Sequence, residues 1–183
     1  MNIEHESGAR AEEGPKESKW FEGDVWRLPS EVGLIDGAEA ALKKRLEKET
    51  AATEDEIFKI GMAFREALVN AIAHGNLGLA SPEEEGATLI AAAEKKHGEL
   101  AAAGMAEKYV IVHIAISPAE VRMTVKDEGE GFSWRKLPDP GDPEHVLRTS
   151  GRGIVITRNF MDSVEFNESG NEITLMKRFS TAS

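Results

Sequence analysis

The stretch Glu66-Ala-Leu-Val-Asn70-Ala-Ile-Ala-His74-Gly75-Asn76 ends the segment with the clearest helical periodicity in the chain. Thr53, followed three residues later by Glu56, forms a capping box and predicts that a helix begins there. Apolar residues then recur at helical spacing and predict one buried face: Ile57, Ile60, Phe64, Ala67, Leu68, Ala71 and Ile72. We expect Gly75 to end this helix.

Glu66 and Asn70 point away from the predicted buried face and lie one turn apart, so their side chains can converge. A carboxylate beside a carboxamide suits a proton acceptor next to a ligand of Mg²⁺, which prefers oxygen donors. A polar outer face is also common on the helices of soluble proteins, so the pair alone leaves both interpretations open. His74 lies on the same side, where it would either line a pocket or pack the helix end.

The chain has 183 residues, of which 40% are hydrophobic, and this length predicts one domain with its own core. Its 33 acidic residues outnumber its 22 basic residues, which gives a net charge of −11 and argues against direct nucleic-acid binding. The absence of cysteine excludes disulfides and thiolate metal sites. No apolar run approaches the ~20 residues of a membrane span, so we expect a cytoplasmic protein that makes no membrane contact.

The N-terminal region differs in composition from the rest of the chain. Residues 1–20 lack periodicity, so we expect a disordered acidic tail, followed by a single domain over residues 21–183. Alternation within residues 21–28 suggests an edge strand. Pro29-Ser30 then predicts the start of a helix that runs to about residue 48.

An alanine-rich segment, residues 81–107, follows the central helix. Ser81, with Pro82 and acidic residues after it, is a signal for a helix start. Because the apolar positions of this segment are mostly alanine, we expect an appended helical cover that buries little.

From residue 108 onward the apolar period switches to two, which predicts strands. The residues expected to face the core are Val110, Val112, Ile114 and Ile116, then Val121, Met123 and Val125. Residues 133–150 contain three prolines and predict a functional lid. A hairpin over residues 164–179 closes the chain. These elements predict a layer of helices on a mostly antiparallel sheet.

A second motif, Asp127-Glu128-Gly129-Glu130-Gly131-Phe132, follows the second of these strands. Glycines at alternate positions let the backbone approach a planar ligand that a Cβ atom would exclude. The aspartate offers an acceptor for an exocyclic amino group such as that of adenine. A plain tight turn would show the same residues, so this motif alone decides nothing.

A third motif, Ser150-Gly151-Arg152-Gly153-Ile154, leads into a predicted helix. Amide groups at a helix start form a phosphate site, and Arg148 and Arg152 could meet a terminal phosphate. A simple helix cap is the alternative. Neither the Walker pattern nor the full Rossmann spacing occurs, and neither do zinc-ligand spacing and the serine-hydrolase elbow.

In this order the three motifs resemble the N, G1 and G2 boxes of the GHKL (Bergerat-fold) ATPase superfamily. The resemblance is closest to the bacterial anti-sigma factor serine kinases. It also draws on Asn159-Phe160-Met161-Asp162 and Val164-Glu165-Phe166, and it covers about residues 28–178. It implies an α/β two-layer sandwich whose mostly antiparallel, mixed sheet is covered by helices on one face. Segment 81–107 is an insertion relative to compact members.

The resemblance also implies a role for each motif residue. Glu66 would be the general base, Asn70 the Mg²⁺ ligand, and Asp127 the acceptor for the adenine amino group. The ATP lid would span residues 133–153. The other residues implied to contact the nucleotide are His74, Gly129, Gly131, Phe132, Arg148, Gly151, Arg152, Gly153 and Thr174. Gly170 stands apart from Thr174, where many members have the two together.

The implied function is an ATP- and Mg²⁺-dependent serine/threonine protein kinase. Its implied partners are a STAS-domain anti-anti-sigma protein and a sigma factor, and related kinases are commonly homodimers. Two alternatives stay open: a nucleotide-gated protein-binding module without significant kinase activity, and a histidine-kinase-like ATPase unit.

Overall fold

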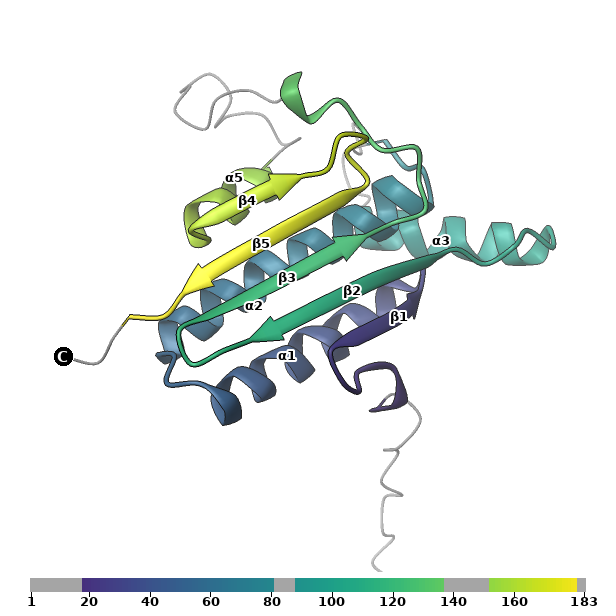
Figure 1. Cartoon of the computed structure of the whole chain (residues 1–183). Helices are drawn as coiled ribbons and strands as arrows, with labels where there is room; N and C mark the ends of the chain where they lie inside the picture. The colour runs from purple at the N-terminus through teal and green to yellow at the C-terminus, as the bar shows by residue number, and fades with distance from the viewer. Residues whose placement is uncertain (1–17, 81–87, 137–151, 181–183) are drawn as a thin grey trace, which may run out of the picture.

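The computed structural model describes residues 18–80, 88–136 and 152–180. These residues form a two-layer α/β sandwich, in which helices pack against one face of a five-stranded sheet (Figure 1). The order of strands across the sheet is β1-β2-β3-β5-β4. Their bounds are β1 Val25–Pro29, β2 Tyr109–Ile116, β3 Glu120–Lys126, β4 Ser163–Phe166 and β5 Glu172–Arg178.

The helices are arranged in two groups. Helices α1 (Ile35–Glu49), α2 (Glu54–Val69) and α5 (Arg152–Phe160) lie behind the sheet, whereas α3 (Leu89–Ala102) projects to its side (Figure 1). The expected fold class is therefore confirmed. Each strand pairing in the described sheet is antiparallel.

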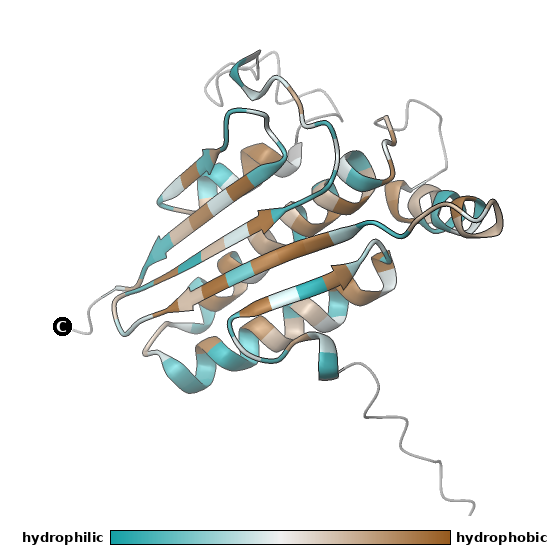
Figure 2. Cartoon of the chain, turned by 45° about the vertical axis from the view of Figure 1, so that its right-hand side comes forward, coloured by the Kyte–Doolittle hydropathy of each residue, from teal (hydrophilic) through white to brown (hydrophobic). Residues whose placement is uncertain are grey.

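The alternation of residues in the strands places one face of the sheet against the helices. Val112 pairs with Val125, and Met123 pairs with both Ile114 and Leu175, and all of these side chains are buried. The central strands are accordingly rich in hydrophobic residues in Figure 2. Burial of such a side chain stabilises the fold by roughly 1.5–3 kcal/mol, so this face holds the helices in place.

Helix α2 supplies the facing half of the core. Its residues Ile60, Phe64 and Leu68 are fully buried, as their helical spacing predicts. Trp26 of β1 packs edge-on against Phe64, with 6.1 Å between ring centroids. The central helix is therefore fixed along its whole length, and its polar side is held at a constant position relative to the sheet.

The predicted start of α2 is confirmed, because Thr53 and Glu56 form both hydrogen bonds of the capping box. The predicted end at Gly75 is wrong. The helix continues past Val69 as a π-helical turn, Asn70–Asn76, and the first glycine with positive φ after this turn is Gly78, at 64°. Gly75 has a different reason to lack a side chain: a Cβ atom there would overlap the carboxylate of Asp127.

Three other boundaries differ from the sequence prediction. β1 extends through Pro29, so the first helix begins only at Ile35, after a 3-10 turn at Val32–Leu34. Helix α3 is capped by Thr88, whose hydroxyl accepts a hydrogen bond from the Ala91 amide, and it ends at Ala102. The expected cap Ser81 lies outside the described residues.

Two further expectations concern the N-terminal tail and α3. The tail prediction extended to residue 20, but Ser18–Trp20 forms a 3-10 turn and Trp20 packs against the core. Residues 1–17 are outside the described part. The expectation that α3 buries little is confirmed, since Ala93 is its one buried residue.

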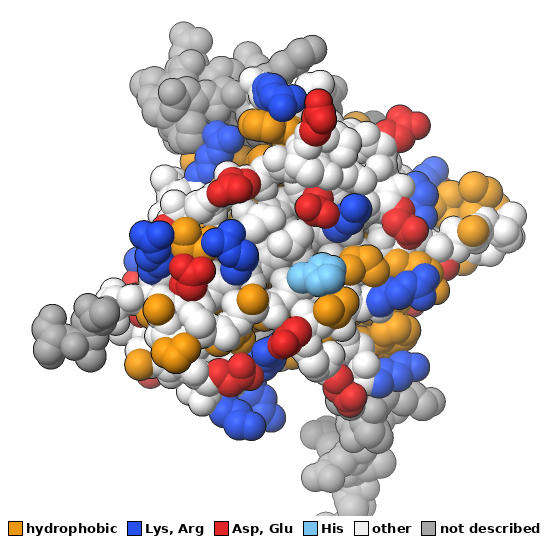
Figure 3. Space-filling model, in the orientation of Figure 1, with side chains coloured by type: hydrophobic (Ala, Val, Ile, Leu, Met, Phe, Trp, Pro, Cys, Tyr) orange, Lys and Arg blue, Asp and Glu red, His pale blue; other side chains and the backbone are white. Residues whose placement is uncertain are grey.

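The face of the sheet turned away from the helices is open, and charged side chains of both signs are scattered around its edge (Figure 3). In the described part of the chain, no helix combines the length and apolar character needed to cross a lipid bilayer.

Candidate functional site

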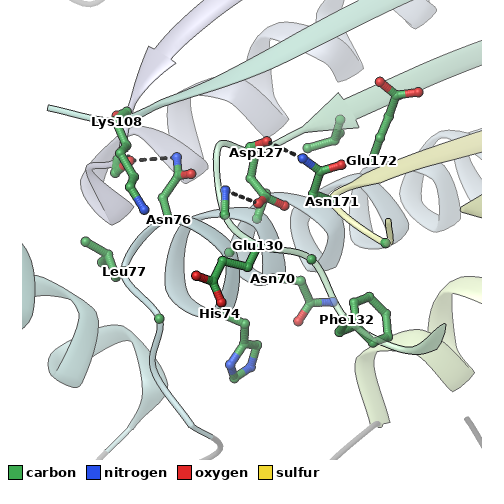
Figure 4. Close-up of a pocket in the computed structure, with 18 of the residues that line it drawn as sticks. Asn70, His74, Asn76, Leu77, Lys108, Asp127, Glu130, Phe132, Asn171 and Glu172 are labelled. Atoms are coloured by element: carbon green, nitrogen blue, oxygen red, sulfur yellow. Dashed lines mark hydrogen bonds between the residues drawn. The ribbon is translucent and has the colours of Figure 1, made fainter. Parts of the chain in front are cut away.

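A cavity of about 940 Å³ opens beside the C-terminal end of α2. Its walls come from the end of α2, the end of β3, the start of β5, the start of α5, and α3. All three sequence motifs contribute to it, and Figure 4 labels lining residues from the first two. The predicted residues that line it are Asn70, His74, Asp127, Gly129, Gly131, Phe132 and Gly153. The fold therefore brings together segments that are far apart in the sequence.

Asp127 lies at the end of β3 and is only 9% exposed. Its Oδ1 accepts a hydrogen bond of 2.8 Å from the Gly129 amide, and its backbone N–H donates to the Asn171 carbonyl at 3.0 Å. Burial raises the pKa of Asp127, while the Gly129 amide and the charge of Lys108 act in the opposite direction. This carboxylate is fixed in position and can still accept a hydrogen bond through Oδ2.

Glycine is required at two positions of the second motif because the backbone packs closely there. A Cβ atom at Gly129 would overlap the carbonyl group of Gly75. Gly131 has φ of 76° and lies against the Ser169 carbonyl. The loop after β3 therefore lies flat on the end of α2 and on the β4–β5 turn, which leaves space for a ligand beside Asp127.

Glu66 is half-buried on α2, and burial raises the pKa of its carboxyl group, opposed only by the charge of Arg65. Arg65 turns away toward α1, where it pairs with Asp36 and Glu39. A Cβ atom at Gly153 would overlap the Glu66 carboxylate, so the start of α5 lies directly against it. A carboxylate with a raised pKa is a better proton acceptor.

His74 combines the two roles that the sequence left open. It lines the cavity, and its Nδ1 lies 2.6 Å from the carbonyl oxygen of Leu79. Because a carbonyl can only accept, Nδ1 carries the hydrogen in this contact. His74 thus holds the segment after the π-helical turn while its ring forms part of the wall.

Asn76 is a site residue that the sequence analysis missed. Its side chain is buried and donates to Ser30 Oγ at 2.9 Å and to the Tyr109 carbonyl at 3.0 Å, while its Oδ1 accepts from the Glu128 amide at 2.7 Å. It thereby joins the end of α2 to β1, β2 and the loop after β3. The sequence did contain a signal for this role, because Asn76 is a polar residue that directly follows His74 and Gly75.

The expectation that Thr174 contacts the ligand is not supported by its position. Its hydroxyl is hydrogen-bonded to Thr124 at 3.1 Å, on the sheet face opposite the helices. Because side chains alternate along β5, the neighbouring Ile173 faces the cavity instead. The sequence analysis chose Thr174 by residue type, without strand parity, and its contact with the nucleotide stays a prediction.

Aromatic side chains bound the cavity beside the second motif. Phe132 packs edge-on against Phe166 of β4, at 5.4 Å between ring centroids, and both line the cavity. Trp134 stacks on Phe166, and its ring N–H donates to the Asn167 carbonyl at 2.8 Å. Phe166 is a second lining residue that the sequence analysis did not single out as part of the site.

Part of the predicted lid, 133–153, lies outside the described residues, and so do Arg148 and Gly151. Trp134–Lys136 forms a 3-10 turn at one end of this segment. At the other end, Arg152 begins α5. The predicted roles of these residues and of Arg152 in phosphate binding stay predictions.

Comparison with known proteins agrees with this geometry. Residues 28–177 match the histidine kinase-like ATPase domain family. The chain is 32% identical over 137 residues to the anti-sigma F factors of Bacillus thuringiensis (strain Al Hakam), Bacillus mycoides (strain KBAB4) and Bacillus cereus (strain AH187). Each match covers 71% of this chain and 75% of the relative. The chain therefore belongs to the histidine kinase-like (GHKL) ATPase family, in the group that includes the anti-sigma F factors.

Proposed function

We propose that the protein is an ATP-dependent serine/threonine protein kinase that phosphorylates a STAS-type anti-anti-sigma partner and so regulates a sigma factor. The observation that carries the proposal is the surroundings of Glu66. This carboxylate is half-buried, has a raised pKa and lies one turn from Asn70, against the start of α5. A helix whose polar side only faced solvent would have no reason to bury it.

In the proposed reaction, ATP lies in the cavity with its adenine amino group donating to Asp127. Glu66 takes the proton from the serine hydroxyl of the partner as that oxygen attacks the γ-phosphorus, and ADP leaves. Phosphoryl transfer depends mainly on positioning and on stabilisation of charge, which a rigid base and backbone amides can supply.

The side-chain oxygen of Asn70 also fits a Mg²⁺ ion, because this ion keeps several waters and takes only one or two oxygen ligands from the protein. Magnesium bound there would neutralise charge on the phosphates. The residues of this chain would hold the nucleotide, accept the proton and keep water away from the reacting groups.

The first test is calorimetric titration with ATP, with and without Mg²⁺, of the wild type and of Asn70→Ala. We expect binding that depends on magnesium and that Asn70→Ala weakens. Absence of binding in the wild type would contradict the proposal.

A second test separates kinase activity from nucleotide-gated binding. Wild-type protein and Glu66→Gln are incubated with Mg-ATP and a STAS-domain protein, and phosphoserine or phosphothreonine is measured. We expect transfer by the wild type and, for Glu66→Gln, retained ATP binding with a rate lower by about 10²–10⁴. If the wild type binds ATP and its partner without transferring phosphate, the protein is a binding module. Transfer to histidine would point to the histidine-kinase-like alternative.

A further inference from the structure

The cavity extends well beyond the three motifs. In Figure 4, Lys108, Asn76 and Leu77 lie on one side of Asp127, and Phe132 and Asn171 lie on the other. The first side continues to helix α3. We call this part the α3 lobe and define it by Leu77, Lys96, Leu100, Ala101, Met105 and Lys108, all of which line the cavity.

The sequence at the end of α3 builds one wall of the α3 lobe. The Met105 amide donates to the Leu100 carbonyl at 3.0 Å, and the Gly104 amide donates to the Ala101 carbonyl at 3.0 Å. Gly104 has φ of 70°, so the helix ends in a Schellman motif. This motif turns the chain back and brings Met105 next to Leu100, two apolar side chains on the same wall.

Hydrogen bonds fix this wall to the site. His97 of α3 contacts Glu107 at 3.2 Å, and Glu107 accepts from the Ser30 amide at 3.0 Å. The Ser30 hydroxyl donates to the Lys108 carbonyl at 2.7 Å and accepts from Asn76. These hydrogen bonds connect α3 to Asn76, which anchors the end of α2. The lobe is therefore held in place by the same residues as the site.

Apolar side chains form part of the α3 lobe, and the polar residues His97 and Glu107 line the cavity beside them. Leu77 is buried and Leu100 half-buried, while Met105 is 62% exposed. The charged residues Lys96 and Lys108 line the lobe as well. An apolar wall that is continuous with a ligand site is typical of a subsite for an apolar part of the ligand.

We propose that the α3 lobe is a subsite for an apolar group attached to the adenine base of the nucleotide, at N6 or C2. The proposal rests on the proposed function, in which the amino group of adenine binds Asp127. N6 and C2 are at the edge of the base that faces Asp127, away from the ribose. An N6 substituent leaves one N–H on that nitrogen, so the hydrogen bond to Asp127 is kept while the substituent enters the lobe.

The test is calorimetric titration of the full chain with ATP, N6-benzyl-ATP and 2-methylthio-ATP. We expect at least one analogue to bind the wild type within about threefold of ATP, because its added group gains apolar contact. Ala101→Trp fills the lobe from an exposed position of α3. This variant should bind that analogue roughly tenfold or more weakly than the wild type does. Its affinity for ATP should stay within about threefold of the wild-type value.

Ala102→Trp is the matched control. Ala102 is the next exposed residue of α3 and does not line the cavity, so this variant should bind all three nucleotides like the wild type. If both analogues bind the wild type more than about tenfold more weakly than ATP, the lobe does not accept them and the inference is wrong. Equal effects of the two tryptophan variants would also overturn it. Failure of ATP itself to bind would instead overturn the proposed function, and this inference with it.

Discussion

Glu56 and Glu66 lie on the same helix, and their surroundings move their pKa values in opposite directions. Burial alone would raise the pKa of Glu56, but hydrogen bonds from Thr53 and Ser180 outweigh it and lower the pKa to about 2. Glu66 is buried without such donors, and its pKa is raised. One glutamate is therefore a permanent anion that fixes the structure, and the other retains affinity for a proton.

The raised pKa of Glu66 predicts the pH dependence of the proposed reaction. As pH falls through that pKa, which lies above the ordinary value of 4.5, the carboxyl group becomes protonated and can no longer act as a base. We expect kcat/KM for phosphoryl transfer to decrease on the acid side with a midpoint above 4.5, and we expect Glu66→Gln to lack this limb. Denaturation at neutral pH is a second measurement: Glu66→Gln should be at least as stable as the wild type, because it removes a buried charge.

A second prediction at this scale concerns Lys108, whose charge lowers the pKa of Asp127. In Lys108→Met, Asp127 should protonate at higher pH and lose its capacity to accept from adenine. The midpoint of ATP binding against pH, measured by calorimetry, should therefore move upward. Lys96→Met is the control, since Lys96 lines the same cavity and has no such effect on Asp127. Equal midpoints for Lys108→Met and the wild type would contradict the prediction.

At the scale of elements, two glycines inside helices serve different purposes. A Cβ atom at Gly153, near the start of α5, would overlap the Glu66 carboxylate. At Gly98, inside α3, a Cβ atom would meet nothing within 4 Å. The first glycine permits the close approach of α5 to α2, and the second only weakens its helix.

These glycines give a matched pair of substitutions. Gly153→Ala should displace the flexible end of Glu66 and decrease kcat by about tenfold or more, with little loss of stability, because reacting groups tolerate only small misplacements. Gly98→Ala should raise the free energy of unfolding by roughly 0.5–1 kcal/mol through helix propensity and leave kcat unchanged. Denaturant unfolding and phosphoryl-transfer assays measure both. A Gly153→Ala enzyme with wild-type kcat would show that α5 does not constrain the base.

At the scale of the whole molecule, Glu56 joins the start of α2 to the end of the described chain. Its carboxylate accepts hydrogen bonds from the Ser180 amide at 2.7 Å and from the Ser180 hydroxyl at 2.8 Å. The Thr53 amide donates to its other oxygen at 2.8 Å. The residues after β5 are thereby fixed against the central helix, and Phe179 is buried beside them.

This contact predicts how stability depends on pH. The pKa of Glu56 is lowered from 4.5 to about 2, so its contribution is present above 4.5 and is lost as pH falls toward about 2. The lowering corresponds to roughly 3 kcal/mol at neutral pH. We expect Glu56→Gln to lose about this amount of unfolding free energy at pH 7. On acidification, the unfolding free energy of this variant should decrease less than that of the wild type. Ser180→Ala, which removes one donor, should show a smaller effect of about 1 kcal/mol. An equal acid dependence in Glu56→Gln and the wild type would contradict this prediction.

The local features of this protein follow from residues that are close together in the sequence. The capping box at Thr53, the helical spacing from Ile57 to Leu68 and the alternation in β2 and β3 are each decided by neighbours in the chain, so they could be predicted. The motif glycines also marked where the backbone packs closely, although the reason for Gly75 was not visible.

The way these elements meet became visible in the folded chain alone. Gly75 is required by the carboxylate of Asp127, which is distant in the sequence, and Asn76 bonds three separate segments. Strand parity at β5 directs Ile173 and not Thr174 to the cavity, and the end of α3 adds a lobe that no motif predicted. Such features depend on contacts between residues far apart in the chain, whereas periodicity and capping report only on neighbouring residues.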